Sequence, residues 1–291
     1  MSTTPSVQER PQGTLEEIAE RISDVSTLPH VALRVMEVAN DPNCGARDLK
    51  EVMEADVSLS TRVLRVVNSS AYAARTKITN LQQAIAFLGS KQVRNLAMTA
   101  SVSKLFQQDE TIGKYRRLGL WKHLVAVGTC ARLLAMRLRL KNFEDIFLAG
   151  LLHDLGLILA DQHFHNAFVE IMLQAEEGKP ICQRELACLG FTHCQLAGEI
   201  TKKWRFPEGV VAAAAYHHGP VVYHGEHIDA VRCVEVANLV CTLKEMPSIG
   251  MNCLRVPQGS ISALKLTKND LVVLGEDLDR ELKANQVLFQ M

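Results

Sequence analysis

The feature that most constrains this chain is the spacing of its hydrophobic residues, which recur every three or four positions almost without interruption from Thr14 onward. This spacing places apolar side chains along one face of a helix, whereas a half-buried strand needs them to alternate. No stretch alternates convincingly, and strand-forming runs are scarce. The sequence therefore predicts an all-α protein, with helices of about 8 to 15 residues joined by tight polar turns.

Capping residues mark the expected helix boundaries in the first half of the chain. Either Ser58 or Ser60 is expected to begin a helix, because a serine hydroxyl accepts one of the free amide hydrogens at a helix start. Asn80 is expected to begin the next helix for the same reason, and Gly89 is expected to end it.

The second half of the chain predicts longer and more apolar helices. Residues 121–138 form one expected helix, and residues 143–159 form the most apolar helix of the chain. Residues 246–267 contain two prolines and are expected to be loose. Asn269 or Asp270 is then expected to cap the final helix.

Charge and composition limit the classes of partner. The 32 basic and 32 acidic side chains cancel, which argues against a nucleic-acid binder that works by bulk charge. Aromatic residues make up only 5% of the chain, too few for a broad surface on which bases stack. We therefore expect no nucleic-acid partner.

No hydrophobic run reaches the roughly 20 residues that a membrane-spanning helix needs. The richest run, residues 146–160, is interrupted by His153 and Asp154. Residues 1–13 are rich in Ser, Thr, Pro and Gln, predict a disordered lead and lack the pattern of a signal peptide. The expectation is a protein without a membrane partner, located in the cytoplasm.

The chain has eight cysteines, and none of them forms a C-x-x-C pair, which argues against a zinc finger or ribbon. Most lie within apolar helical stretches, so we interpret them as small buried hydrophobic residues in a reducing cytosol. Cys188 and Cys194 flank His193 and are the alternative, as soft metal ligands.

Five histidines and one aspartate occupy positions where polar side chains are rarely buried without a partner or a metal. His153 and Asp154 lie together inside the apolar stretch GLLHDLGLIL. The other members lie on an apolar helix face or at helix ends: His123, His193, His217 and His218. Four separate helices supply the set, as a metal site between the helices of a bundle requires.

Each member of this set also has a simpler explanation. A single histidine on an apolar face is usually a core residue bonded to a backbone carbonyl, and a His-His pair at a helix end can complement the helix dipole. What favours a metal site is the order and context of the whole set.

Two groups of motifs, one in each half of the chain, identify a known family. The second half carries W-x-H (Trp121, His123), GLLHDLG (150–156), His193, and W-x-x-P before HH (Trp204, Pro207, His217, His218). The first half carries LP at 28–29, NDP at 40–42, and two long segments at 48–72 and 78–96. The second half resembles the HD superfamily of metal-dependent phosphohydrolases, and the first half resembles the segment specific to its HDOD subfamily.

The resemblance implies a fold and a division of the chain. The fold is a multi-helix HD-domain-like bundle with an N-terminal HDOD-specific helical subdomain. After the lead at 1–13, residues 14–110 form the N-terminal helical part and residues 111–243 the HD-like part. Residues 244–291 form a loose connection and a C-terminal helix.

The resemblance also implies a role in bacterial signalling. It predicts an output or scaffold protein that acts through a signalling protein partner, or through a nucleotide-like ligand, at a degenerate HD-type pocket. The alternative is a metal-dependent phosphohydrolase with an altered site. The sequence assigns no catalytic residue to either.

Departures from the catalytic relatives favour the first of these roles. Asn238 stands where those relatives carry the Asp that completes the metal site, and a neutral amide oxygen is a weaker ligand for hard cations. Leu157 stands where the HD-GYP phosphodiesterases carry Lys, and their GYP signature is replaced by HHGPVVYHG, so cyclic di-GMP hydrolysis is not expected. The remaining imidazoles and one carboxylate suit Fe, Mn, Ni or Zn, as one or two ions.

Two polar features of the first half have structural explanations. In the stretch 68–78, Asn and Ser side chains are expected to satisfy nearby backbone groups, in preference to forming a partner surface. Arg75, Lys77, Lys91 and Arg94 are interpreted as a solvated face in preference to a nucleotide contact.

Overall fold

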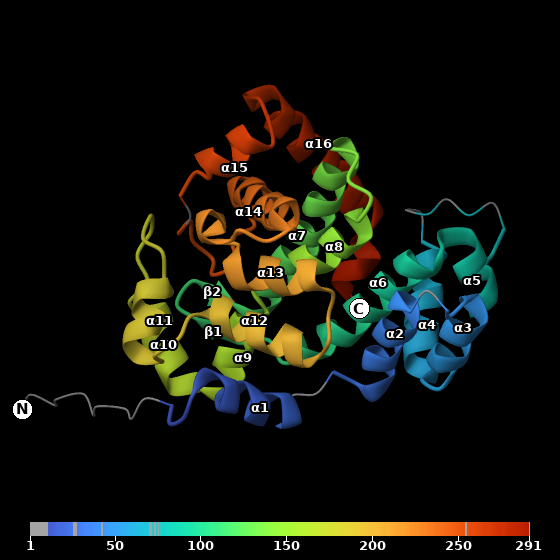
Figure 1. Ribbon diagram of the computed structural model, residues 1–291, viewed down its shortest axis with the longest axis horizontal. Helices are drawn as coiled ribbons and strands as arrows, with labels where there is room; N and C mark the ends of the chain where they lie inside the picture. The colour runs from blue at the N-terminus through green and yellow to red at the C-terminus, as the bar shows by residue number, and fades with distance from the viewer. Residues whose placement is uncertain are drawn as a thin grey trace, which may run out of the picture.

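The computed structural model describes residues 11–25, 28–41, 43–69, 72, 74, 76–253 and 255–290, and these residues are almost entirely helical (Figure 1). The predicted all-α fold is confirmed. Most of the expected lead, residues 1–10, lies outside the described residues. The helices of the first part are α1 (Leu15–Val25), α2 (His30–Asn40), α3 (Ala46–Glu54), α4 (Val57–Val67), α5 (Leu81–Leu88) and α6 (Ser90–Val102).

The longer second part is also helical. Its helices are α7 (Arg117–Arg137), α8 (Phe143–Leu152), α9 (Leu155–His163), α10 (His165–Leu173), α11 (Cys182–Cys188), α12 (His193–Lys203), α13 (Glu208–Tyr216), α14 (Ile228–Leu243), α15 (Gln258–Ala263) and α16 (Lys268–Ala284). Short 3-10 helices are η1 (Ser103–Phe106), η2 (Pro220–Val222) and η3 (Gln286–Gln290). Strands β1 (Thr111–Ile112) and β2 (Tyr115–Arg116) form a small antiparallel hairpin in the segment that precedes α7.

The helices form two lobes that meet at α6. Helices α2 to α5 form the smaller lobe, and α6 packs against α2 and α4 on one side and α8 on the other (Figure 1). In the larger lobe α7, α8, α13 and α14 pack on one another, and α12 packs on α13 and α9. Helix α1 lies against α12, away from α2 to α5 (Figure 1).

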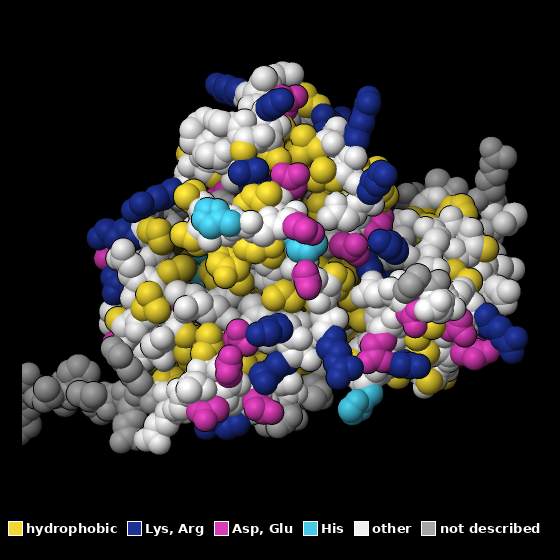
Figure 2. Space-filling model, viewed as in Figure 1, with side chains coloured by type: hydrophobic (Ala, Val, Ile, Leu, Met, Phe, Trp, Pro, Cys, Tyr) yellow, Lys and Arg dark blue, Asp and Glu magenta, His cyan; other side chains and the backbone are white. Residues whose placement is uncertain are grey.

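The surface agrees with the balanced charge of the sequence. On the face drawn in Figure 2, Lys and Arg side chains alternate with Asp and Glu over both lobes. None of the described helices is both long enough and apolar enough to cross a membrane.

The cap predicted for α4 is wrong. Asp56, not Ser58 or Ser60, precedes the first helical residue, and its carboxylate accepts the backbone amide hydrogen of Leu59. An aspartate is as good a cap as a serine, and it lies one residue before the helix, where its oxygen reaches the free amides.

The start predicted for the last helix is also wrong by a few residues. Thr267 caps α16 and accepts the amide hydrogen of Asp270, whose carboxylate in turn accepts the Thr267 amide hydrogen. Asp270 is therefore the third residue of a capping box and not the cap. The segment 246–267, expected to be loose, also contains α15.

The most apolar predicted helix, 143–159, is two helices. The chain bends at His153 and Asp154, which separate α8 from α9. A continuous helix would direct adjacent side chains about 100° apart, whereas the bend lets both face the same interior space. The interruption of the apolar run therefore marks a structural joint.

The interpretation of the basic cluster as a solvated face is wrong for Arg94. This side chain is fully buried, and its guanidinium lies 2.7 Å from Asp145 of α8 and donates to Asn40 of α2. Arg75 lies outside the described residues. The backbone role expected of Asn68 is confirmed, since its side chain donates to the carbonyl of Ile78 and accepts that residue's amide hydrogen. The same role is wrong for Ser69, whose buried hydroxyl has no hydrogen-bond partner among the described residues.

Candidate metal centre

The structure brings the predicted histidines and aspartate to one place inside the larger lobe. His123 comes from α7, and His153 and Asp154 form the joint between α8 and α9. His193 is the first residue of α12, and His217 and His218 follow the end of α13. Within this set only His218 is exposed.

Asp154 lies at the middle of the set. Its Oδ2 atom is 3.3 Å from His153 Nε2 and 3.7 Å from His123 Nε2. Its Oδ1 atom is 3.2 Å from His193 Nε2 and 3.1 Å from His217 Nε2. One carboxylate therefore faces two pairs of imidazoles, one pair with each oxygen.

Backbone carbonyls fix the orientation of three of these rings. His123 Nδ1 lies 2.6 Å from the carbonyl oxygen of Met246, and His153 Nδ1 lies 2.7 Å from the carbonyl oxygen of Gly150. In His217 the same atom lies 3.0 Å from the carbonyl oxygen of Ala214. A carbonyl can only accept, so each Nδ1 carries a hydrogen and each Nε2 faces the interior, where it offers a lone pair once it carries no proton.

A carboxylate that the sequence analysis did not identify orients the fourth ring. The Nδ1 atom of His193 lies 2.8 Å from both oxygens of Glu185, which is buried on α11. Glu185 also accepts the backbone amide hydrogen of His193. Metal-bound histidines commonly donate to a carboxylate in this way.

Burial and neighbouring charges set the protonation of the centre. Burial, together with the neighbouring His153, lowers the pKa of His123 to about 4, so this ring is neutral at neutral pH. Burial alone would raise the pKa of Asp154, but His153, His193 and His217 outweigh it and hold that pKa well below its usual value. The centre therefore combines an ionised carboxylate with an imidazole that is ready to coordinate.

The donors form two groups that could each hold an ion. His123, His153 and Asp154 form one group, and Asp154, His193, His217 and His218 form the other, with the ligand atoms of each group within 4.8 Å of one another. Asp154 Oδ1 is buried, and among the described residues it accepts no well-aligned hydrogen bond, although imidazole nitrogens of His193 and His217 lie 3.2 and 3.1 Å away. An unpaired buried carboxylate oxygen facing imidazole lone pairs fits a metal ion, and Asp154 is placed to bridge two.

Asn238, the last candidate ligand, lies on α14, which packs against α7, α8 and α13. Its side chain is buried, and its Oδ1 atom is also without a hydrogen-bond partner in the part of the chain that the structure describes. An unpartnered amide oxygen can coordinate a cation, although it brings no charge, so the role of Asn238 as a ligand stays a prediction.

A narrow cavity of about 30 Å³ reaches the two histidines His193 and His218. Its other walls are mainly apolar, and they include Leu157, Ile181 and Ile249. No Lys or Arg is among the described residues that line it. The cavity has room for about one or two water molecules.

Comparison with known proteins identifies the family. The sequence pattern of the HDOD domain matches residues 25–220, about two thirds of the chain. This chain belongs to the HDOD family. An uncharacterised protein of Treponema pallidum (strain Nichols) is 23% identical to this HDOD protein over 224 residues, which are 76% of this chain and 43% of that relative. The chain thus spans less than half the length of this curated relative.

Solved structures share the fold of this HDOD protein. An HDOD domain protein of unknown function from Geobacter sulfurreducens superposes with a TM-score of 0.75 at 23% identity, covering 94% of this chain and 95% of the other. A provisionally described signal transduction protein from Marinobacter aquaeolei VT8 superposes with a TM-score of 0.75 at 25% identity, and the match covers 98% of this chain and 62% of the other. A provisionally described phosphohydrolase from Shewanella amazonensis SB2B superposes with a TM-score of 0.72 at 18% identity, and the match covers 96% of this chain and 98% of the other. The predicted HD-superfamily fold is confirmed.

Proposed function

We propose that this protein is a cytoplasmic bacterial signal-transduction output protein that binds metal at the HD-type centre and acts by binding, without turnover. The ligands of that centre would be His123, His153, Asp154, His193, His217 and His218, with Asn238 as a neutral addition. Imidazoles and a single carboxylate suit Fe, Mn, Ni or Zn.

The observation that carries the proposal is the access to the centre. The cavity that reaches it measures about 30 Å³ and is walled by apolar residues such as Leu157 and Ile249. A phosphate ester is larger than this space, and its charge needs Lys, Arg or backbone amide donors, as in other phosphate sites. Through this cavity the centre would therefore admit an ion and a water, but not a phosphate ester.

A wider groove beside the centre is the place we propose for a nucleotide-like ligand. It has a volume of about 570 Å³, which is in the range of small-molecule sites. His218 lines it together with Tyr223, Arg232 and Ser260, so a bound ligand would touch one residue of the centre. Arg232 would meet an anionic group of the ligand. Binding in this groove, or of a protein partner, would be the output.

A metal-dependent phosphohydrolase is the second candidate. The observation that favours it is the placement of Asp154 between two groups of imidazoles, which suits a pair of ions. A bound metal would supply a Lewis acid and an activated water. This chain's residues would hold the ions and exclude bulk water, but the described residues around the narrow cavity offer no cation for the phosphate.

Turnover by metal-verified protein decides between the two functions. The purified protein is loaded with Mn²⁺ or Fe²⁺, its metal content is measured, and it is assayed with phosphomonoesters, nucleotides and cyclic dinucleotides. We expect bound metal and no hydrolysis above that of a His153→Ala variant, which should lose the ion held by His123, His153 and Asp154. Hydrolysis by the loaded protein that His153→Ala abolishes would overturn the proposal and establish the second candidate.

The ligand groove has its own test. Calorimetric titration with nucleoside monophosphates and cyclic dinucleotides should detect binding to the metal-loaded protein, and Arg232→Ala should weaken it. Equal binding by Arg232→Ala would place the ligand elsewhere, and no binding of either class would leave only a protein partner as the output.

A further inference from the structure

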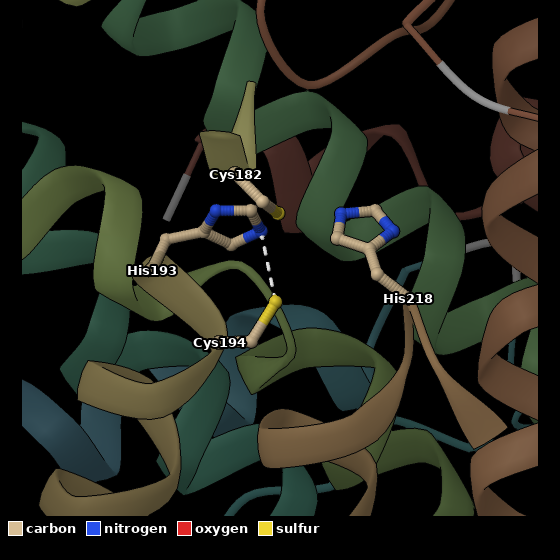
Figure 3. A group of neighbouring side chains, drawn as sticks. All are labelled: Cys182, His193, Cys194 and His218. Atoms are coloured by element: carbon tan, nitrogen blue, oxygen red, sulfur yellow. Dashed lines mark hydrogen bonds between the residues drawn. The ribbon is translucent and has the colours of Figure 1, made fainter. Parts of the chain in front are cut away.

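Two thiols lie against the imidazoles of the centre and are not explained by a His/Asp site. Cys194 Sγ is 3.3 Å from His193 Nε2 and 3.7 Å from His217 Nε2. Cys182, the first residue of α11, adds a second sulfur (Figure 3). Of the two cysteines that flank His193 in the sequence, Cys194 belongs to this cluster and Cys188 does not.

The four donors surround a common point. Figure 3 shows His193 and Cys194 projecting from α12, with Cys182 beside them and His218 reaching in from the opposite side. One ligand atom from each of the four lies within 4.8 Å of the others. In a tetrahedral zinc site with Zn–S near 2.3 Å and Zn–N near 2.0 Å, neighbouring ligand atoms are about 3.3 to 3.8 Å apart. The group therefore needs only a small contraction.

We propose that Cys182, His193, Cys194 and His218 form a thiol-containing metal site that takes a thiophilic cation such as Zn²⁺. Two sulfurs and two imidazole nitrogens are a common tetrahedral ligand set for zinc, and soft sulfur ligands select against Mg²⁺ and Mn²⁺. The sulfur of Cys194 is buried among ring nitrogens and not in an apolar core.

The geometry makes this site an alternative to part of the His/Asp centre. Because Glu185 holds Nδ1 of His193, that histidine has one lone pair to give, on Nε2. The same nitrogen faces Asp154 Oδ1 at 3.2 Å and Cys194 Sγ at 3.3 Å. An ion bound by the thiols would therefore use His193 and His218, which are then not available to the group that also contains Asp154 and His217. His123 and His153 can still bind an ion together with Asp154.

Helix α11 positions the thiol site. It carries Cys182 at its first residue and Glu185 three residues later, one turn along the same helix. One short helix thus supplies a ligand and also the carboxylate that orients His193. This arrangement fixes the sulfur and the ring relative to each other before any ion binds.

Cobalt is the probe that reports sulfur ligation directly. Co²⁺ bound by thiolate has an intense ligand-to-metal charge-transfer absorption that Co²⁺ bound by nitrogen and oxygen lacks. Titration of the metal-free protein with Co²⁺ should give this absorption, and Zn²⁺ should remove it by displacement. Cys182→Ser and Cys194→Ser should each reduce the absorption to about half or less and weaken Zn²⁺ binding by about tenfold or more.

Matched variants separate this site from its surroundings. Cys188→Ser, which changes a cysteine on the same helix as Cys182, should keep the full absorption. His153→Ala should also keep it, although it removes a ligand of the His/Asp centre. Retention of the thiolate absorption in His153→Ala, together with its loss in Cys182→Ser, therefore supports this site whatever the turnover assays show.

Either of two results would overturn the proposal: saturating Co²⁺ that gives no thiolate absorption, or an absorption that both serine variants retain in full. Circular dichroism and thermal melting establish that the variants are folded. Cys182 is only partly buried, so Cys182→Ser remains a valid test if the fully buried position of Cys194 does not tolerate serine.

Discussion

At the level of single residues, each oriented histidine of the centre is held by Nδ1, so that Nε2 faces the other members of the centre. Three rings are held by backbone carbonyls, which no side-chain substitution can remove. His193 differs because a side chain, Glu185, holds it. The orientation and basicity of the His193 ring can therefore be tested by substitution of Glu185.

Glu185→Gln should weaken metal binding without unfolding the protein. The amide oxygen can still accept from His193 Nδ1, but the negative charge that strengthens the ring as a ligand is lost, and the expected fall in affinity is about 10- to 100-fold. Competition between the protein and a chelator for Mn²⁺ measures it. Glu170→Gln, an exposed substitution on α10, is the control and should leave the affinity unchanged. Equal affinities in the two variants would show that Glu185 does not act on the metal.

The buried hydroxyl of Tyr115 should make the folded protein less stable in alkaline solution. This hydroxyl donates to Asp161 at 3.1 Å, and burial together with the charge of Asp161 raises its pKa far above the ordinary value of 10.0. The unfolded chain ionises near that ordinary value and the folded one does not, so the stabilisation is complete below about pH 10 and falls as the pH rises further.

The measurement is urea unfolding of the protein and of Tyr115→Phe at about pH 8 and about pH 11. At the lower pH the variant should be less stable by about 1 kcal/mol, because it lacks the hydrogen bond to Asp161. Between the two pH values the parent should lose more stability than the variant, since only the parent carries the shifted hydroxyl. Parallel losses would contradict the assignment.

At the level of elements, two glycines of the GLLHDLG motif allow helices to meet at the centre. A Cβ on Gly150 of α8 would lie 2.7 Å from the Cα of Gly128 on α7, the helix that carries His123. A Cβ on Gly156 of α9 would lie 2.0 Å from the backbone oxygen of His193. Side chains at these positions would separate the elements that carry the ligands.

Gly156→Ala should therefore damage both stability and metal binding. The clash is with backbone at the start of α12, which cannot move without displacing His193, so we expect a loss of about 1 to 3 kcal/mol or more and a clear loss of metal affinity. Gly259→Ala on α15, where a Cβ would meet no described atom within 4 Å, should be neutral or slightly stabilising. Thermal melting and metal titration of both variants test this, and identical behaviour would refute the close approach.

The sequence predicted the helices and the histidine–aspartate set because both follow from local signals. Periodic apolar residues define the helices, and His153 and Asp154 stand out within an apolar run. The joint between α8 and α9 was missed because neither Gly nor Pro stands at residues 153–154, and the apolar pattern continues on both sides of them. The caps at Asp56 and Thr267 were missed by small shifts, since several neighbouring residues can accept a free amide.

Glu185 and Cys182 could not be identified from spacing. They precede His193 by 8 and 11 residues and lie on a different helix, beyond a turn at Gly190 with φ of 84°. Helical periodicity relates positions within one helix and says nothing about which faces of two helices meet. Arg184 and Glu185 are the charged residues of the short helix 182–188, and nothing in the sequence distinguishes the buried carboxylate from an ordinary exposed charge.

At the level of the whole molecule, a buried polar network joins the two lobes. Arg94 of α6 contacts Asp145 of α8 at 2.7 Å, and its neighbour Asn95 donates to Glu144 at 2.6 Å. Arg132 of α7 contacts the other oxygen of Glu144 at 2.8 Å. Because His153 directly follows α8, this network also connects the smaller lobe to the helix that leads into the centre.

Arg94→Ala should be severely destabilising, because it leaves Asp145 without its buried partner at the joint between lobes. Removal of one member of a buried ion pair costs about 3 to 5 kcal/mol. Lys91→Ala is the matched control: Lys91 lies 3.4 Å from the same carboxylate, but its side chain is 53% exposed, so the loss should be about 1 kcal/mol or less. Urea unfolding measures the stability of both variants. Helix content shows whether the variants remain folded, and the metal affinity of the His/Asp centre shows whether the larger lobe is intact. A cost for Arg94→Ala no larger than that for Lys91→Ala would show that the lobes are held together by apolar packing alone.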